Sequence, residues 1–254
     1  MIEERFEVEG TPDLDVSVPA GSLTIDPGSP GSVVVQVDTN RPESWHVGQS
    51  GNHIWVHHER WTVAGRSSRA RVRIVAPPGT TLNARTAATD IRISVPLERA
   101  NVVAAAGDVE VGHAAHLAIK TASGDVRIGA VDGDLEVRSA SGDVDVGRVG
   151  ASASVTSASG DVTIESVAGA MSVTTASGDV RVRRYEGEDL QASTMSGTLR
   201  VGLPAGRTVR LDARTLSGSV RLPPRKPSSG TSSAQVALRL KSVSGDIVID
   251  RLEA

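Results

Sequence analysis

Six aspartates recur at nearly equal intervals through the middle of the chain, and their carboxylates are the side chains best placed to do chemistry. The intervals between them are 18, 17, 18, 18 and 18 residues. The six residues are Asp90, Asp108, Asp125, Asp143, Asp161 and Asp179. If equal spacing stacks them about 5 Å apart, they repel one another unless a cation or backbone N–H groups compensate the charge. A calcium ladder and a hydrogen-bonded corner are the two alternatives.

The local sequence favours the hydrogen-bonded corner. Calcium-binding β-rolls carry Gly-Gly-x-Gly-x-Asp in both bends of each turn, so that carboxylate and carbonyl ligands meet at the ion. Here each repeat holds one acidic bend, of the form Ser-Gly-Asp-Val, with few glycines. Aspartates in such bends commonly accept neighbouring amides. We therefore expect a structural corner ladder, without metal or other cofactor, formed by Asp108, Asp125, Asp143, Asp161 and Asp179.

Basic residues form a second candidate site. Two positions after each aspartate the chain reads Arg92, Glu110, Arg127, Asp145, Thr163 and Arg181, an alternation of charge that stacked strands favour. The same position then holds Arg200 and Arg221. Stacked like charges cost stability, so Arg181, Arg200 and Arg221 are a candidate stripe for an anionic partner: lipid headgroups, an acidic polymer or another protein. A solvated flank with a blurred register is the favoured alternative.

His53, Trp55 and His57 alternate, so they can share one face of a strand. Two histidines on one face suggest a zinc pair, but no further ligand cluster accompanies them, and a polar face with incidental histidines is favoured. The flat rings of Trp55 and Trp61 suit sugars, yet packing within an N-terminal cap is the favoured role.

The sequence argues against an enzyme. It contains no P-loop, dinucleotide glycine motif, Gly-x-Ser-x-Gly or His-Glu-x-x-His. Polysaccharide-cleaving β-helices need an aromatic groove with converging carboxylates, whereas Tyr185 is the one aromatic residue of the regular repeats and the aspartates are evenly spread.

The aspartates can stack only if the secondary-structure elements that carry them stack, and the spacing of the apolar residues indicates the type of these elements. Counted from Val126, apolar residues fall at offsets 0, 2, 5, 9, 11 and 14, and the same offsets recur from Val144 and Val162. In the first repeat they are Val126, Ile128, Val131, Leu135, Val137 and Ala140. Spacing by two is typical of strands, and Gly, Asp and Ser mark the bends. We predict an all-β, elongated single-stranded β-solenoid, right-handed by the crossover rule, with all six positions facing inward.

The 18-residue period does not cover the whole chain. Residues 1–80 lack it and are expected to form an irregular N-terminal β cap, continuous with a solenoid over residues 81–254. A proline- and serine-rich stretch predicts a flexible loop at 223–235. Ile247 to Ile249 then returns as a final strand, whose edge is blunted by Asp250, Arg251 and Glu253.

Composition narrows the partners and the compartment. The net charge is −3 and cysteine is absent, which argues against nucleic-acid binding, disulfides and thiolate metal sites. The first residues lack the apolar segment of a secretory signal, and no stretch approaches ~18 consecutive apolar residues. We expect a cytoplasmic protein, with peripheral contact to an anionic membrane left open.

Two segments resemble the bacterial putative-adhesin family, a β-strand-repeat domain of unknown function. They are Val75-Ala76-Pro77-Pro78-Gly79-Thr80-Thr81-Leu82, and Thr121-Ala122-Ser123-Gly124-Asp125-Val126 with its successors. The resemblance spans roughly Phe6 to Ile249 and implies a bacterial repeat protein found with and without membrane anchors.

We therefore expect a non-enzymatic structural or interaction protein that presents a rigid surface to a protein, cell-envelope or anionic partner. A self-assembling β-helical filament is the first alternative. A carbohydrate-active β-helix is the second. Partner identity and oligomeric state stay open at this point.

Overall fold

The computed structural model describes residues 1–59, 69–205, 207–223 and 235–252, and β-strands are the dominant structure of these residues. One short 3-10 turn, η1 (Pro42–Ser44), interrupts the strands. Among the described residues, no helix has the length and apolar character needed to cross a lipid bilayer. The chain divides into two compact units, Met1–Val131 and Asp132–Ala254. Trp61 and most of the predicted 223–235 loop lie outside the described residues.

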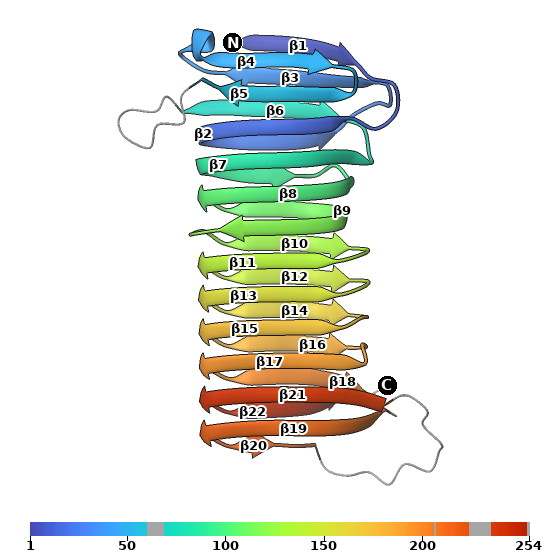
Figure 1. The fold of residues 1–254 in the computed structure, drawn as a ribbon, viewed down its shortest axis with the longest axis vertical. Helices are drawn as coiled ribbons and strands as arrows, with labels where there is room; N and C mark the ends of the chain where they lie inside the picture. Colours follow the sequence, from blue (N-terminus) through green and yellow to red (C-terminus); the bar gives the residue numbers. More distant parts are fainter. Residues whose placement is uncertain (60–68, 206, 224–234, 253–254) are drawn as a thin grey trace. The chain divides into compact units, whose positions relative to one another are not determined.

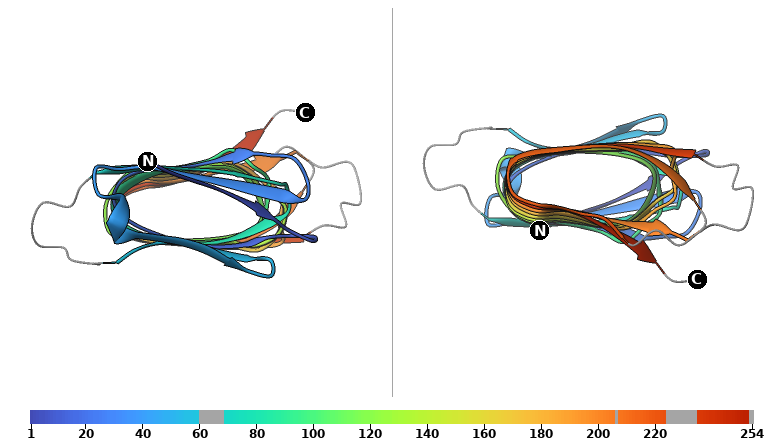
Figure 2. Two further views of the ribbon diagram at one scale, coloured as in Figure 1. Left: turned by 90° about the horizontal axis from the view of Figure 1, so that it is seen from above. Right: turned by 90° about the horizontal axis from the view of Figure 1, so that it is seen from below.

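The second unit stacks its strands turn upon turn in two facing walls (Figures 1 and 2). The strands are β11 (Leu135–Ser141), β12 (Val144–Val149), β13 (Ala153–Ser159), β14 (Val162–Val167), β15 (Met171–Ser177), β16 (Val180–Tyr185), β17 (Asp189–Ser196), β18 (Leu199–Pro204), β19 (Thr208–Ser217), β20 (Val220–Arg221), β21 (Gln235–Ser244) and β22 (Ile247–Leu252). One wall has the order β11-β13-β15-β17-β21-β19, and every pair is parallel. The other wall, also parallel, has the order β12-β14-β16-β18-β22-β20.

Equivalent residues of successive turns lie side by side in this unit, as the 18-residue spacing predicts. Val144 is paired in register with Val162, and Val162 with Val180. All three side chains are at most 1% exposed, so the interior is a stack of aliphatic columns. Burying such side chains supplies most of the favourable free energy, at about 25 cal/mol per Å² of apolar surface. The result is an all-β, β-solenoid-like unit.

One of the six predicted inward positions is wrong. Ala140 and Ala158 are exposed and Ala176 is partly exposed, while the residue before each of them is buried. Those buried residues are Ser139, Ser157 and Thr175. The reason is strand alternation: the wall that begins with Leu135 and Val137 inward must also turn residue 139 inward. The hydroxyl tolerates burial because Ser139 Oγ donates to the carbonyl of Ser141 at 3.1 Å, and Ser157 repeats that bond to Ser159.

The predicted final strand forms as β22, but the last two turns stack in the reverse of chain order, which sequence reasoning did not predict. β21 lies between β17 and β19, and β22 lies between β18 and β20 (Figure 1). Among the described residues, β20 covers β22 only at Ile247 and Val248, so Asp250 and Arg251 are paired with β18 on one side and have no partner from β20 on the other; Glu253 lies outside the described residues. The turn that is placed inside buries Leu238, Leu240 and Ile247 to at most 1% exposure, whereas the outer turn has no fully buried residue. The more apolar turn occupies the interior position.

The first unit combines parallel turns with antiparallel pairs (Figure 1). Its strands are β1 (Ile2–Glu7), β2 (Asp13–Pro27), β3 (Ser32–Asp38), β4 (Trp45–Ser50), β5 (His53–His58), β6 (Ala70–Ala76), β7 (Thr80–Ile93), β8 (Leu97–Ala106), β9 (Val109–Thr121) and β10 (Val126–Val131). β2 is parallel to β5, β6 and β7, and β7 to β9 carry the regular turns. The pairs β1–β3, β3–β6 and β4–β5 are antiparallel. Trp45 is buried in this part.

Candidate interaction surface

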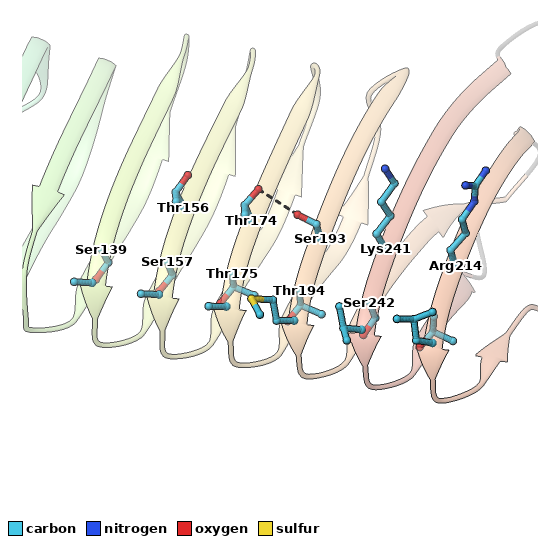
Figure 3. Close-up of a pocket in the computed structure, with 17 residues that line it drawn as sticks. Ser139, Thr156, Ser157, Thr174, Thr175, Ser193, Thr194, Arg214, Lys241 and Ser242 are labelled. Carbon is cyan, nitrogen blue, oxygen red and sulfur yellow. Dashed lines mark hydrogen bonds between the residues drawn. The ribbon is translucent and has the colours of Figure 1, made fainter.

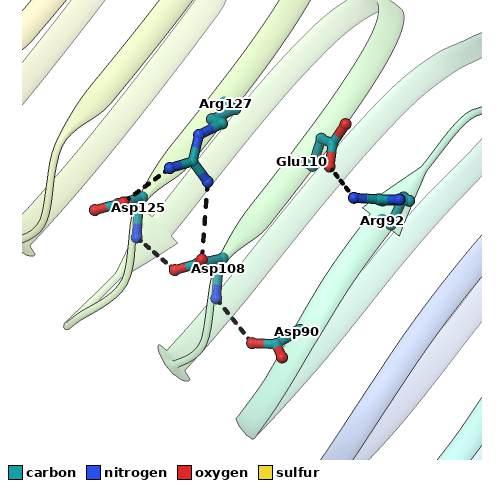
Figure 4. Close-up of polar contacts among 6 residues, drawn as sticks. All are labelled: Asp90, Arg92, Asp108, Glu110, Asp125 and Arg127. Carbon is teal, nitrogen blue, oxygen red and sulfur yellow. Dashed lines mark hydrogen bonds and ion pairs between the residues drawn. The ribbon is translucent and has the colours of Figure 1, made fainter.

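In the aspartate corner, carboxylates accept the backbone N–H of the following turn. In the first unit, Asp108 N–H donates to Asp90 Oδ1 at 3.2 Å, and Asp125 N–H donates to Asp108 Oδ1 at 2.9 Å (Figure 4). In the second unit, Asp161 N–H donates to Asp143 and Asp179 N–H donates to Asp161, at 2.9 and 2.8 Å. A glycine precedes each corner aspartate from Asp108 to Asp179 and allows this approach: a Cβ on Gly160, at φ +113°, would lie 2.2 Å from the carbonyl oxygen of Gly142.

Arginines add to the compensation of the corner charges. Arg127 reaches Asp108 at 3.8 Å and Asp125 at 3.0 Å, and Arg92 pairs with Glu110 at 2.8 Å (Figure 4). Among the described residues, no three histidine, aspartate or glutamate side chains converge closely enough to hold a metal ion. The hydrogen bonds of the corner show its carboxylates tying one turn to the next.

The same chemistry joins the two turns that stack in reverse order. Asp246 Oδ1 accepts the Ser219 N–H at 2.8 Å and the Ser219 hydroxyl at 2.9 Å. These two hydrogen bonds lower the pKa of the Asp246 carboxyl, the backbone bond having the larger effect. Ser219 itself has no carboxylate to offer. The reversed order therefore places Asp246 next to the outer turn, where Ser219 can donate hydrogen bonds to its carboxylate.

The predicted arginine stripe is broken by this order. Arg181 and Arg200 are register neighbours, but Val248 of β22 lies between Arg200 and Arg221. Arg200 pairs with Asp250 at 3.8 Å and Arg221 pairs with Asp246 at 4.0 Å. Since two of the three arginines face carboxylates, the stripe is not a continuous anion-binding surface.

The histidine face of β5 meets two carboxylates of β2. His53 Nδ1 lies 3.0 Å from Asp13 Oδ2, and His57 Nε2 lies 3.5 Å from Asp15 Oδ1. The ring of Trp55 crosses Gly48 so closely that a Cβ there would lie 2.5 Å from it. Sequence reasoning missed the two aspartates as partners. Their alternation with the buried Leu14 and Val16 was the signal that could have placed them on the outer face.

Three of the exposed large apolar side chains of the second unit follow one outer corner of its first wall. Leu216, Met195 and Val243 are 86%, 63% and 47% exposed, on the adjacent strands β19, β17 and β21. The register of these strands sets the three side chains in one row, which Ala176, Ala158 and Ala140 continue. We call this row of six residues the apolar corner row.

A groove of about 640 Å³ runs along the apolar corner row (Figure 3). Its other side is lined by outward side chains of the same strands: the small hydroxyl residues Thr156, Thr174 and Ser193, then the cations Lys241 and Arg214. Ser193 Oγ donates to Thr174 Oγ1 at 3.3 Å. The groove thus grades from small hydroxyl-bearing side chains to large apolar ones beside two cations. Sequence reasoning missed it because it assigned the three alanines to the interior and left Met195, Leu216 and Val243 unassigned.

The family resemblance is confirmed by comparison with known proteins. The model of the Toastrack DUF4097 family matches residues 13–250. No curated protein matches the chain. Two solved structures that resemble it are putative adhesins from Bacteroides fragilis and Parabacteroides merdae, with TM-scores of 0.48 and 0.44 and identities of 14% and 9%. In both cases the match covers 99% of this chain and 96% of the other. A structure named a putative lipid binding protein, from Parabacteroides distasonis, has a TM-score of 0.41, 12% identity and the same coverage. The chain belongs to the Toastrack DUF4097 family, a family of domains of unknown function.

Proposed function

We propose that this protein is a non-enzymatic scaffold that presents its apolar corner row to an anionic surface of the cell envelope. The proposal keeps the expectation of a cytoplasmic protein in peripheral contact with the membrane. A right-handed winding of the turns also remains our prediction.

The apolar corner row carries the proposal. Single exposed hydrophobic residues are common on protein surfaces, but a contiguous exposed apolar row marks an interaction site. Here the three largest members occupy three adjacent parallel strands, so that their spacing is set by the backbone. A rigid row of this kind meets a partner without the cost of ordering a loop.

The side chains beside the row favour a partner with negative charge. Lys241 and Arg214 line the same groove as Met195, Leu216 and Val243. Arg214 also bonds Asp212 of its own strand at 2.9 Å, which leaves Lys241 as the stronger candidate for an external anion. Apolar side chains flanked by cations are the pattern of peripheral contact with anionic lipid.

Flotation of the full chain with lipid vesicles tests this proposal. Vesicles containing phosphatidylglycerol should carry the protein upward, and vesicles of phosphatidylcholine alone should carry much less. The triple variant Met195→Ser, Leu216→Ser, Val243→Ser should lose flotation, and Lys241→Glu should weaken it. Val103→Ser, at a 39% exposed valine of β8, is the matched control and should float like wild type. Equal flotation of the triple variant and wild type, or no flotation of either, would overturn the proposal.

A further inference from the structure

The outermost turn of the second unit leaves its interior columns open. β19 is paired with β21, and among the described residues it has no strand on its other side. Its inward residues Val209 and Leu211 are partly exposed, whereas their register partners Val236 and Leu238 on β21 are at most 1% exposed. On the other wall, Val220 of β20 is 41% exposed. A parallel edge with an open apolar column is a template for a further strand.

The outward charges of β19 do not protect this edge against a copy of itself. Natural edges are commonly blunted by an excess of one charge, as in β1, where Glu3, Glu4 and Glu7 outnumber Arg5 in one short strand. β19 instead alternates Arg210, Asp212 and Arg214. A strand with alternating charge is complementary to itself when it is reversed.

We propose that two copies of this chain associate by antiparallel pairing of their β19 strands about Leu211. In that register Leu211 faces the partner's Leu211, and Val209 faces the partner's Ala213. Arg210 faces the partner's Asp212, and the symmetry repeats this contact on the other side. Apolar columns thus meet apolar columns, and every outward charge next to the axis meets its opposite.

A twofold contact of this kind leaves no free β19 edge, because the β19 strand of each copy is paired with that of the other. It therefore yields a dimer and excludes the end-to-end filament that the sequence left open. The inference goes beyond the proposed membrane contact and stands or falls separately. Arg210→Glu leaves Met195, Leu216 and Val243 in place, so vesicle flotation of that variant still reports on the apolar corner row alone.

Sedimentation velocity of the full chain, from about 1 to 100 µM, tests the association. Wild type should show a monomer–dimer equilibrium. Arg210→Glu and Asp212→Arg should each weaken dimerisation by about tenfold or more, because each places like charges opposite one another. An equimolar mixture of the two variants should restore the dimer, since the Arg210→Glu copy offers two acids to the two bases of the Asp212→Arg copy. Arg181→Glu, an exposed position on β16 inside its wall, is the control and should dimerise like wild type.

A disulfide cross-link tests the register of the proposed β19 pairing. The chain has no cysteine, so Leu211→Cys introduces a single thiol at the proposed axis. Cβ atoms of directly opposed residues in an antiparallel pair approach to about 4.5–5.5 Å, close to disulfide reach. Oxidation should give a cross-linked dimer, and Thr163→Cys on β14 should not. A wild type that stays monomeric at 100 µM, filaments in negative-stain micrographs, or a dimer unaffected by Arg210→Glu would overturn the proposal.

Discussion

The regular turns β13 to β16 and the last turns β19 to β22 use the same corner, but in different chain order. In the regular turns each aspartate bonds the amide 18 residues later, as Asp161 does with Asp179. In the last turns Asp246 bonds the amide of Ser219, which is 27 residues earlier. The corner thus selects its neighbour by hydrogen-bonding capacity and apolar content, and not by proximity along the chain. The stacking order therefore depends on which turn can form the corner hydrogen bonds and bury apolar side chains.

The largest expected effect breaks the regular turns at their glycine. Gly160→Ala should destabilise the protein by about 4 kcal/mol, because a strained φ and a backbone clash each cost about 1–3 kcal/mol. Its Cβ would lie 2.2 Å from the Gly142 oxygen. Gly218→Ala makes the same clash with Gly245, but on an outer turn that can shift, so a smaller loss is expected. Urea unfolding followed by circular dichroism measures both. Gly51→Ala, at φ +60° with open space around its Cβ, is the control that carries the φ strain without the clash and should lose only about 1 kcal/mol; a similar loss in all three variants would contradict the argument.

The next effect compares the interiors of the two final turns. Leu238→Ala on β21 should cost about 3 kcal/mol, as is usual for a fully buried leucine. Leu211→Ala on β19 should cost about 1 kcal/mol or less, because its side chain is already partly in water. Both are best measured by urea unfolding in the Arg210→Glu background, so that association does not contribute. Equal losses would show that β19 is as well covered as β21, which would contradict the open edge.

A smaller effect belongs to Tyr185, where the regular spacing ends. Its hydroxyl donates to the carbonyl of Asp189 at 2.6 Å, so Tyr185→Phe should cost about 1 kcal/mol. Burial raises the pKa of this tyrosine to about 12. The phenol stabilises the fold while it is protonated. That contribution is complete below the ordinary pKa of about 10 and is lost as pH rises through 12. Tyr185 is the one tyrosine of the chain, so the absorbance change in an alkaline titration reports the ionisation of this phenol alone. Titration of the folded protein near 10 would refute the burial.

The smallest effect concerns Asp246, which ties β22 to β20. Its lowered pKa means that its contribution is complete above the ordinary carboxyl value and is lost as pH falls through the lowered one. Protection of the Ser219 N–H from hydrogen exchange should fall over that acid range, as measured by NMR. Asp246→Asn keeps an acceptor without the titrating charge, so its protection should not follow that acid transition. If acid leaves wild-type protection unchanged, the carboxylate is not what holds β20.

The sequence predicted the repeating part of the fold well, because one spacing there governs everything. An interval of 18 residues is enough to place Val144 beside Val162 and to stack the corner aspartates. It could not predict the depth of Ala140, since a small apolar residue just before a bend fits either side of the wall. Small size permits both placements, and only the alternation begun at Leu135 decides between them.

Spacing also could not reveal the reversed order of the last turns. Gly197, Gly218 and Gly245 carry nearly the same corner sequence, so each can stack on either of the others. Two weak signals pointed to the outcome: Asp246 is the acidic corner among the three, and the turn of Leu238 and Leu240 is the more apolar. The apolar corner row was missed for a different reason: the alanines of the regular turns were assigned to the interior, so Met195, Val243 and Leu216, which occupy the same position in later turns, were left unassigned.

The bond from each corner carboxylate to the next amide has a consequence for how such genes change in length. Each turn with an aspartate corner donates its amide to the carboxylate of the turn before and offers its own carboxylate to the turn after, so the interfaces between such turns are interchangeable. Tandem duplication or loss of one turn's coding segment, such as that for residues 144–161, leaves a working junction without any compensating substitution. Evolution can thus adjust the reach of this protein in steps of one turn, while the ends that carry its specific surfaces stay unaltered.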